Sequence, residues 1–231
     1  MSEQIELVYK MLKSLQEAGI LGNMIIVGSW CIHFYRHHYR ESEVLPPLRT
    51  RDIEFDVSFL RHARNKVNVI ELLEKLGFLV DFKGSGFTNL ESPELIVEFL
   101  VPEKGKGSSA PRVISGFGIN AQPIRFLNFL EERLIDVSYR DLVVKIPHPA
   151  WFAIHKLIIS RRRPEHQATK KSNDITQALA VWDMVVAMGE KGELREVLSW
   201  IPKGWLKLVK ESLVLAQQAE RLEDMQVQSP R

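Results

Sequence analysis

The chain has 231 residues, of which 45% are hydrophobic and 26% charged, and its formal net charge at pH 7 is +2. These values describe an ordinary globular protein and exclude a strong overall attraction to nucleic acid or to membrane surfaces. Cys31 is the only cysteine, which excludes an intrachain disulfide and a cysteine-based metal cluster. We therefore expect a reducing, cytoplasmic compartment, and no segment approaches the ~20 apolar residues of a membrane span.

The first 40 residues predict a helix, a buried strand and a second helix. Apolar residues recur at helical spacing from Ile5 to Leu15, and "MIIVG" (Met24–Gly28) is typical of a buried strand. Ser29 follows as a candidate N-cap. A Gly-Ser turn at a helix N-terminus offers backbone N–H groups, a hydroxyl and the positive end of a helix dipole, which suit a phosphate. Such a turn alone is more often a plain strand–helix connection.

An acidic segment follows a proline pair. Its acidic and apolar residues alternate, which predicts a half-buried strand with its carboxylates on one face; the residues are Asp52, Ile53, Glu54, Phe55, Asp56 and Val57. Carboxylates on one face repel one another unless a cation lies among them. Asp52 and Glu54 lie ~6.6 to 6.8 Å apart along a strand, a spacing that suits two divalent cations. Glu54 and Asp56 are an alternative pair of metal ligands. The simplest alternative is that these acidic residues only form a solvated strand edge.

The middle of the chain predicts a helix over residues 65–77, strands near 78–82 and 86–92, and a buried strand, Glu94–Pro102. Glu98 lies among apolar residues of this last strand, where burying a carboxylate is costly unless it is paired or binds a metal. It could join the same cations or pair with Arg125. Residues 103–112 predict a polar loop, and short strands follow at 134–139 and 142–147.

Beyond Pro149 only helical periodicity remains. We therefore expect a mixed α/β domain over residues 1–149 and a helical domain over 150–231, with a disordered tail at 225–231. The segment Lys156–Lys171 contains six basic residues and one acidic residue. This segment favours triphosphate or RNA binding, although its run Arg161–Arg163 is equally typical of a solvated loop.

The motifs together resemble the DNA polymerase beta-type nucleotidyltransferase superfamily, especially its uncharacterised and abortive-infection type members from bacteria and archaea. The resemblance rests on "GS" at Gly28 and Ser29, on "T-x-D-I-E" from Thr50 to Glu54, and on the later Glu98. It implies a mixed sheet with flanking helices, followed by a C-terminal helical part.

The resemblance also implies site residues. The Gly-Ser turn would hold a nucleoside triphosphate, and Asp52, Glu54 and Glu98 would bind two Mg²⁺ ions. A lysine and a "K-x-x-D" motif recur in the helical part of such proteins, and Lys156, Lys171 and Asp174 are similar to them. Glu54 stands where the family usually has Asp, and the interval from the turn to Asp52 is longer than in compact members.

We therefore expect a metal-dependent enzyme that moves a nucleoside monophosphate from an NTP to a hydroxyl on RNA, protein or a small molecule. The alternative is a non-catalytic nucleotide- or RNA-binding module on the same fold. Neither the acceptor, the base preference nor the oligomeric state follows from the sequence.

Overall fold

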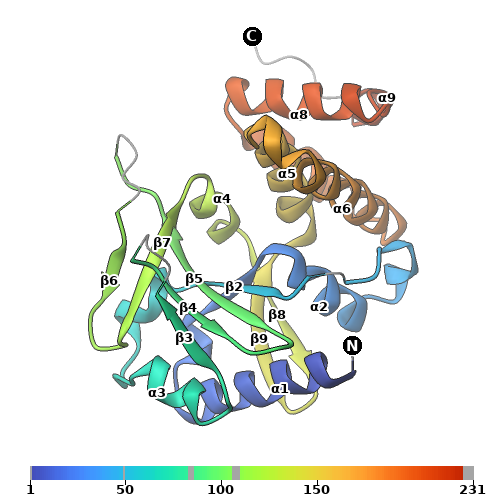
Figure 1. The fold of residues 1–231 in the computed structure, drawn as a ribbon. Coiled ribbons are helices and arrows are strands. Elements are labelled where there is room, and N and C mark those ends of the chain that lie inside the picture. Colours follow the sequence, from blue (N-terminus) through green and yellow to red (C-terminus); the bar gives the residue numbers. More distant parts are fainter. Residues whose placement is uncertain (1, 49, 83–85, 106–109, 226–231) are drawn as a thin grey trace. The chain divides into compact units, whose positions relative to one another are not determined.

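The computed structural model describes residues 2–48, 50–82, 86–105 and 110–225. The chain divides into two compact units, one of residues 1–34 with 48–147 and one of residues 35–47 with 148–231. The first unit is mixed α/β and the second is helical (Figure 1). The predicted fold class is confirmed, whereas the single domain boundary near Pro149 stays a prediction. Residues 106–109 of the predicted loop and 226–231 of the predicted tail lie outside the described residues.

A mixed sheet forms the first unit (Figure 1). Its central path runs β1-β2-β5-β4-β3, with β7 beside β5 and β6 beside β7, which makes seven strands among the described residues. β2 is parallel to β5, and β5 to β7, while the other pairs are antiparallel. The strands are β1 (Ile25–Val27), β2 (Asp52–Asp56), β3 (Leu79–Phe82), β4 (Thr88–Glu91), β5 (Ile96–Pro102), β6 (Arg112–Ile114) and β7 (Ile119–Ile124). A separate antiparallel pair is formed by β8 (Leu134–Tyr139) and β9 (Leu142–Pro147).

The two sides of β2 and β5 differ in burial, as the alternation of their residues predicts. One side consists of fully buried apolar residues, which are Ile53, Phe55, Val97 and Phe99. The other side carries the half-exposed Asp52, Glu54 and Glu98. The remaining helical segments of this unit are α1 (Ser2–Glu17), η1 (Leu21–Asn23), η2 (Gly28–Trp30), η4 (Ser58–His62), α3 (Val69–Glu74) and α4 (Leu127–Glu131).

The second unit is built around α5 (Pro149–Ser160), which is buried along almost its whole length. His148 caps this helix, because its Nδ1 accepts a hydrogen bond from the Ala150 N–H and Pro149 occupies the first turn. α5 packs against α6, α7 and α8. The other elements are η3 (Arg40–Val44), η5 (Glu165–Gln167), α6 (Ala168–Ala187), α7 (Lys191–Trp200), α8 (Lys203–Leu215) and α9 (Glu220–Glu223), and α2 (Cys31–His38) begins in the first unit and ends in the second. None of the described helices is long and apolar enough to cross a membrane.

Candidate active site

The register of the sheet brings together carboxylates that are far apart in the sequence. Glu54 on β2 and Glu98 on β5 are direct partners in the parallel pair, so their side chains leave the same face from strands ~4.8 Å apart. Asp52 precedes Glu54 by two residues and shares this face. The three predicted site carboxylates therefore emerge from one small area of the sheet.

The Gly-Ser turn adjoins the same area. β1 pairs with β2 so that Val27 lies opposite Glu54, and Gly28 follows directly. Gly28 has a left-handed φ of 68°, and a Cβ added there would lie 1.5 Å from Oε2 of Glu54. Only glycine therefore fits at this position. Ser29 lies inside the turn η2, so helical backbone begins earlier than the predicted N-cap.

Side chains outside the carboxylate set fix the starts of the two strands. The Gln4 amide donates hydrogen bonds to the carbonyl oxygens of Thr50 at 2.8 Å and Glu94 at 3.1 Å. Arg51 donates to the Ser92 carbonyl at 2.7 Å, and its own carbonyl accepts a bond from the Ile96 N–H. These bonds hold the segments before β2 and β5 in register, which positions Asp52 and Glu98.

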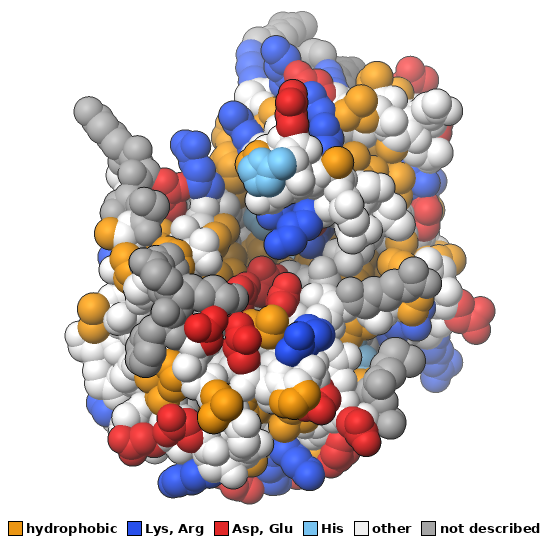
Figure 2. Space-filling view, in the orientation of Figure 1, with side chains coloured by type: hydrophobic (Ala, Val, Ile, Leu, Met, Phe, Trp, Pro, Cys, Tyr) orange, Lys and Arg blue, Asp and Glu red, His pale blue; other side chains and the backbone are white. Residues whose placement is uncertain are grey.

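The carboxylate face continues onto β4 and β3. Asn89 lies directly opposite Glu98, and Glu91 and Asp81 occupy positions of the same face. Figure 2 shows acidic side chains gathered over the region of β2, β4 and β5. Asn89 is only 7% exposed, and an amide beside Glu98 can orient that carboxylate or an acceptor group. Sequence reasoning missed Asn89 because strand register decides which side chains are neighbours.

Asp56, the alternative member of the acidic pair, has a different environment. It is fully buried, and its Oδ1 accepts a hydrogen bond from the Ser58 N–H at 2.9 Å. Burial, together with the nearby Glu131 carboxyl, raises the pKa of Asp56 to about 8. The burial of Asp56 favours Asp52 and Glu54 as the outward-facing pair. The alternative partner proposed for Glu98 is also occupied, because Arg125 pairs with Glu103 at 3.2 Å.

The carboxylate face has the chemistry of a magnesium site. Three carboxylates supply the hard oxygen ligands that Mg²⁺ prefers, and the missing side chain at Gly28 leaves the Glu54 carboxylate beside the turn. As they stand, no three His, Cys, Asp or Glu side chains in the described part of the chain are arranged to hold a metal ion. What suits magnesium here is the type of these residues and their strand register alone.

Two of the three predicted nucleotide-binding residues of the second unit, Lys156 and Asp174, form a buried ion pair that Arg163 joins. Lys156 is 5% exposed, and its Nζ donates to Oδ1 of Asp174 at 2.8 Å. Nε of Arg163 donates to Oδ2 of the same carboxylate at 2.9 Å. Removing one partner from a buried pair of this kind typically costs about 3–5 kcal/mol. The cluster links Lys156 on α5 to Asp174 on α6, and its role toward a nucleotide stays a prediction.

The remaining basic residues of this segment differ in availability. Arg161 pairs with Glu211 at 3.2 Å, whereas Arg162 is exposed. Lys171 is half-exposed on α6, one turn before Asp174. Two of the three arginines of the run therefore bind carboxylates of their own unit.

Comparison with protein families identifies the chain. The sequence model of a nucleotidyltransferase family matches residues 6–199. The chain belongs to this nucleotidyltransferase family. It is thus an enzyme of nucleotidyl transfer, as the resemblance of its motifs implies.

Comparison with solved structures finds matches of low sequence identity to this nucleotidyltransferase. The antibiotic-resistance factor ANT(2'')-Ia is 13% identical with a TM-score of 0.45, over 84% of this chain and 96% of that chain. Its complex with adenylyl-2''-tobramycin is 14% identical, also at 0.45, over 80% and 96%. An antigenic nucleotidyltransferase-like protein from Paracoccidioides brasiliensis is 12% identical with a TM-score of 0.48, over 95% and 91%. No curated protein matches the chain.

Proposed function

We propose that the chain is a magnesium-dependent nucleotidyltransferase that moves a nucleoside monophosphate from an NTP, such as ATP, to a hydroxyl of RNA, protein or a small molecule. The observation that carries this proposal is the direct register of Glu54 with Glu98, together with the contact that Gly28 leaves open for Glu54. We keep the reducing cytoplasm as the proposed compartment, because Cys31 is the only cysteine.

Each residue has a proposed task. Asp52, Glu54 and Glu98 would hold two Mg²⁺ ions, which when bound activate the attacking hydroxyl and neutralise charge on the leaving phosphates. Ser29 and the backbone N–H groups of the turn would bind the β- and γ-phosphates. Glu98 would also accept the proton of the acceptor hydroxyl.

Lys156, Lys171 and Asp174 stay proposed nucleotide contacts of the second unit. Lys171 is half-exposed, and within the described part of the chain no ion pair holds its ammonium group, so it can reach a phosphate. For Lys156, a nucleotide contact requires the ammonium group to be shared between a phosphate and Asp174. We therefore assign direct phosphate binding to Lys171 first.

The test is the variant Asp52→Asn, with Asp136→Asn as a matched control on β8. The control residue is exposed and pairs only with Lys145 at 3.1 Å among the described residues. Calorimetry with ATP, CTP, GTP and UTP, with and without Mg²⁺, measures nucleotide binding, and labelled NTPs in a cell extract reveal the acceptor. We expect Asp52→Asn to reduce transfer at least a hundredfold, about 2.7 kcal/mol of barrier, while Asp136→Asn retains it.

The fold should survive the Asp52→Asn change, because removing one of several neighbouring negative charges relieves repulsion in metal-free buffer. Circular dichroism checks this point. Wild-type protein that binds NTPs equally with and without Mg²⁺ contradicts the proposal, as does full transfer by Asp52→Asn.

A further inference from the structure

A cavity lies in the first unit, and its lining includes none of the residues of the carboxylate face. Its volume is about 710 Å³, within the range of small-molecule sites. Its wall is formed by the segments at the ends of β2 and β5, and by η4, β6 and α4. Ser58, on its wall, begins η4, two residues after β2 ends at Asp56. None of the five residues proposed for the turn and the carboxylates lines it.

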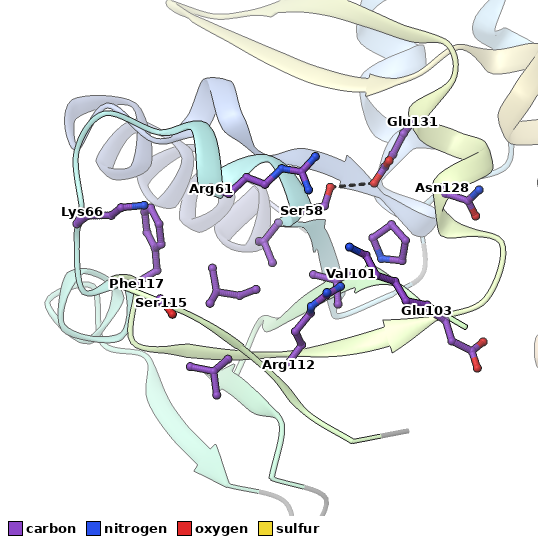
Figure 3. Close-up of a pocket in the computed structure, with 15 residues that line it drawn as sticks. Ser58, Arg61, Lys66, Val101, Glu103, Arg112, Ser115, Phe117, Asn128 and Glu131 are labelled. Atoms are coloured by element: carbon purple, nitrogen blue, oxygen red, sulfur yellow. Dashed lines mark hydrogen bonds between the residues drawn. The ribbon is translucent and has the colours of Figure 1, made fainter. Parts of the chain in front are cut away.

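The charged groups on the wall are mostly positive. Four cationic side chains line the cavity, which are Arg61, Lys66, Lys104 and Arg112, against two carboxylates, Glu103 and Glu131. Figure 3 shows the guanidinium groups of Arg61 and Arg112 extending into the cavity, whereas the Glu103 carboxylate points away from it. The cavity thus gathers positive charge in a molecule whose formal net charge is only +2.

Each of the two carboxylates already has a partner, which lies outside the cavity for Glu103 and on its wall for Glu131. Glu103 pairs with Arg125 outside the cavity, and Oε1 of Glu131 accepts a hydrogen bond from the Ser58 hydroxyl at 2.8 Å. Within the described residues neither Lys104 nor Arg112 contacts a carboxylate. Gathering like charges costs free energy, and an anion among them offsets that cost.

One cation is held in place by local packing. Nζ of Lys66 lies 4.6 Å from the centre of the Phe117 ring, a distance typical of a cation–π contact. The stem of Lys66 crosses Gly116, where an added Cβ would lie 2.9 Å from it. Arg61 donates through Nε to Nε2 of His62 at 2.9 Å, which leaves its terminal nitrogens for another acceptor.

Apolar side chains also line the cavity. Val57, Val101, Val113, Ile114 and Phe117 line it, so a purely inorganic anion would leave this surface uncovered. Arginine forks bind phosphate in a bidentate manner. We propose that this cavity is a second ligand site, which binds a small organic phosphate with an apolar or aromatic part through Arg61 and Arg112. The site works without Mg²⁺ and without the carboxylate face.

The probe for this site is 1-naphthyl phosphate, which combines the two features and is not a nucleotide. Calorimetry in buffer with EDTA compares it with inorganic phosphate and with 1-naphthol. We expect 1-naphthyl phosphate to bind with a Kd below about 1 mM. Each of the other two compounds, which has one feature only, should bind at least tenfold more weakly.

Variants locate the binding. Arg61→Gln and Arg112→Gln should each weaken 1-naphthyl phosphate about tenfold, because each removes one guanidinium from the wall. Arg64→Gln is the matched control, since Arg64 is exposed on the same unit and does not line the cavity. It removes the same charge and should leave the affinity within twofold. Thermal unfolding verifies that all three variants fold.

Asp52→Asn separates this site from the transfer site. It should leave 1-naphthyl phosphate binding unchanged while it reduces transfer at least a hundredfold, so each proposal can fail without the other. No saturable binding to the wild type overturns the second site. The second site is also overturned if Arg64→Gln and Arg112→Gln weaken 1-naphthyl phosphate binding equally, or if Asp52→Asn weakens it.

Discussion

At the scale of single residues, Gly28 decides where the Glu54 carboxylate can lie. A methyl group at position 28 would overlap Oε2 of Glu54 and would require an L-residue at φ 68°. Gly28→Ala should therefore displace Glu54, destabilise the protein by about 2 kcal/mol or more, and weaken Mg²⁺-dependent NTP binding at least tenfold. Urea unfolding and calorimetry measure the two effects.

Gly22→Ala is the control for this change, because an added Cβ there meets nothing within 4 Å. It should shift stability by less than about 0.5 kcal/mol. Adding Glu54→Asp to Gly28→Ala should recover part of the loss, since Cγ of Glu54 lies 3.5 Å from the added Cβ. An unchanged Gly28→Ala protein would show that the turn does not constrain Glu54.

Some candidate site residues follow from sequence alone and others do not. Gly28, Asp52, Glu54 and Glu98 are found because strand alternation and motif order are local properties of the chain. The pairing of Lys156 with Asp174 does not follow from the sequence, whose motifs indicate each residue only as a separate nucleotide ligand. A buried ion pair depends on how two helices pack, which no local spacing records.

At the scale of elements, the carboxylates on β2 and the carboxylate on β5 should have different roles in transfer. In a two-metal site the third carboxylate acts chiefly on the catalytic metal and the acceptor. Glu98→Gln keeps the shape of the side chain and removes its charge. We expect NTP binding with Mg²⁺ to change less than about tenfold, about 1.4 kcal/mol. Transfer should fall at least a hundredfold, about 2.7 kcal/mol of barrier.

Both quantities are measured on one preparation, with circular dichroism as the folding control. Glu91→Gln on β4 provides a comparison, because Glu91 shares the face of Glu98 but pairs opposite Ile96. It should keep transfer within about threefold. Loss of binding together with transfer in Glu98→Gln would assign Glu98 to the nucleotide itself, and no change in either would make it structural.

Elements with a simple period were predictable. The strands now seen as β1, β2, β5, β8 and β9 and the C-terminal helices each follow from apolar alternation or helical spacing. β6, β7 and α4 were not predicted. β7 contains Pro123 near its end, which is typical of a strand break, and α4 spans only five residues, too few to display a period.

At the scale of the whole molecule, pH should act on stability through His155 on α5. Burial, together with the charge of Lys156, lowers the pKa of His155 to about 3. Between pH 3 and the ordinary value of about 6.5 the unfolded chain binds the extra proton. This contribution to stability is therefore complete above about pH 6.5 and is lost as pH falls toward 3.

His155→Gln should remove this dependence. Between pH 7 and pH 5 the wild type should lose about 2 kcal/mol more unfolding free energy than the variant, as urea unfolding at the two pH values measures. Asp174 and Arg163 also face His155 and are kept in both proteins. His166→Gln, at an exposed position, should keep the wild-type slope, and equal slopes for His155→Gln and wild type would contradict the assignment.

The grouping of residues 35–47 with the C-terminal helices could not be predicted from sequence. Tyr35 packs edge-on against Phe152 at a ring distance of 5.6 Å, and η3 contacts α6. These partners are more than a hundred residues apart, and the proline pair after η3 indicates only that the chain turns. Contacts of such range depend on packing rather than on a local pattern.

The parallel pairing of β2 with β5 also has a consequence during synthesis. β1 can pair with β2 as soon as both have left the ribosome, but β5 follows about 40 residues later, or ~2 to 8 s at ordinary translation rates. During this interval one edge of β2 stays open to other nascent chains. Charged side chains discourage edge-to-edge association, so Asp52 and Glu54 should protect the growing polypeptide from aggregation before they serve the finished enzyme.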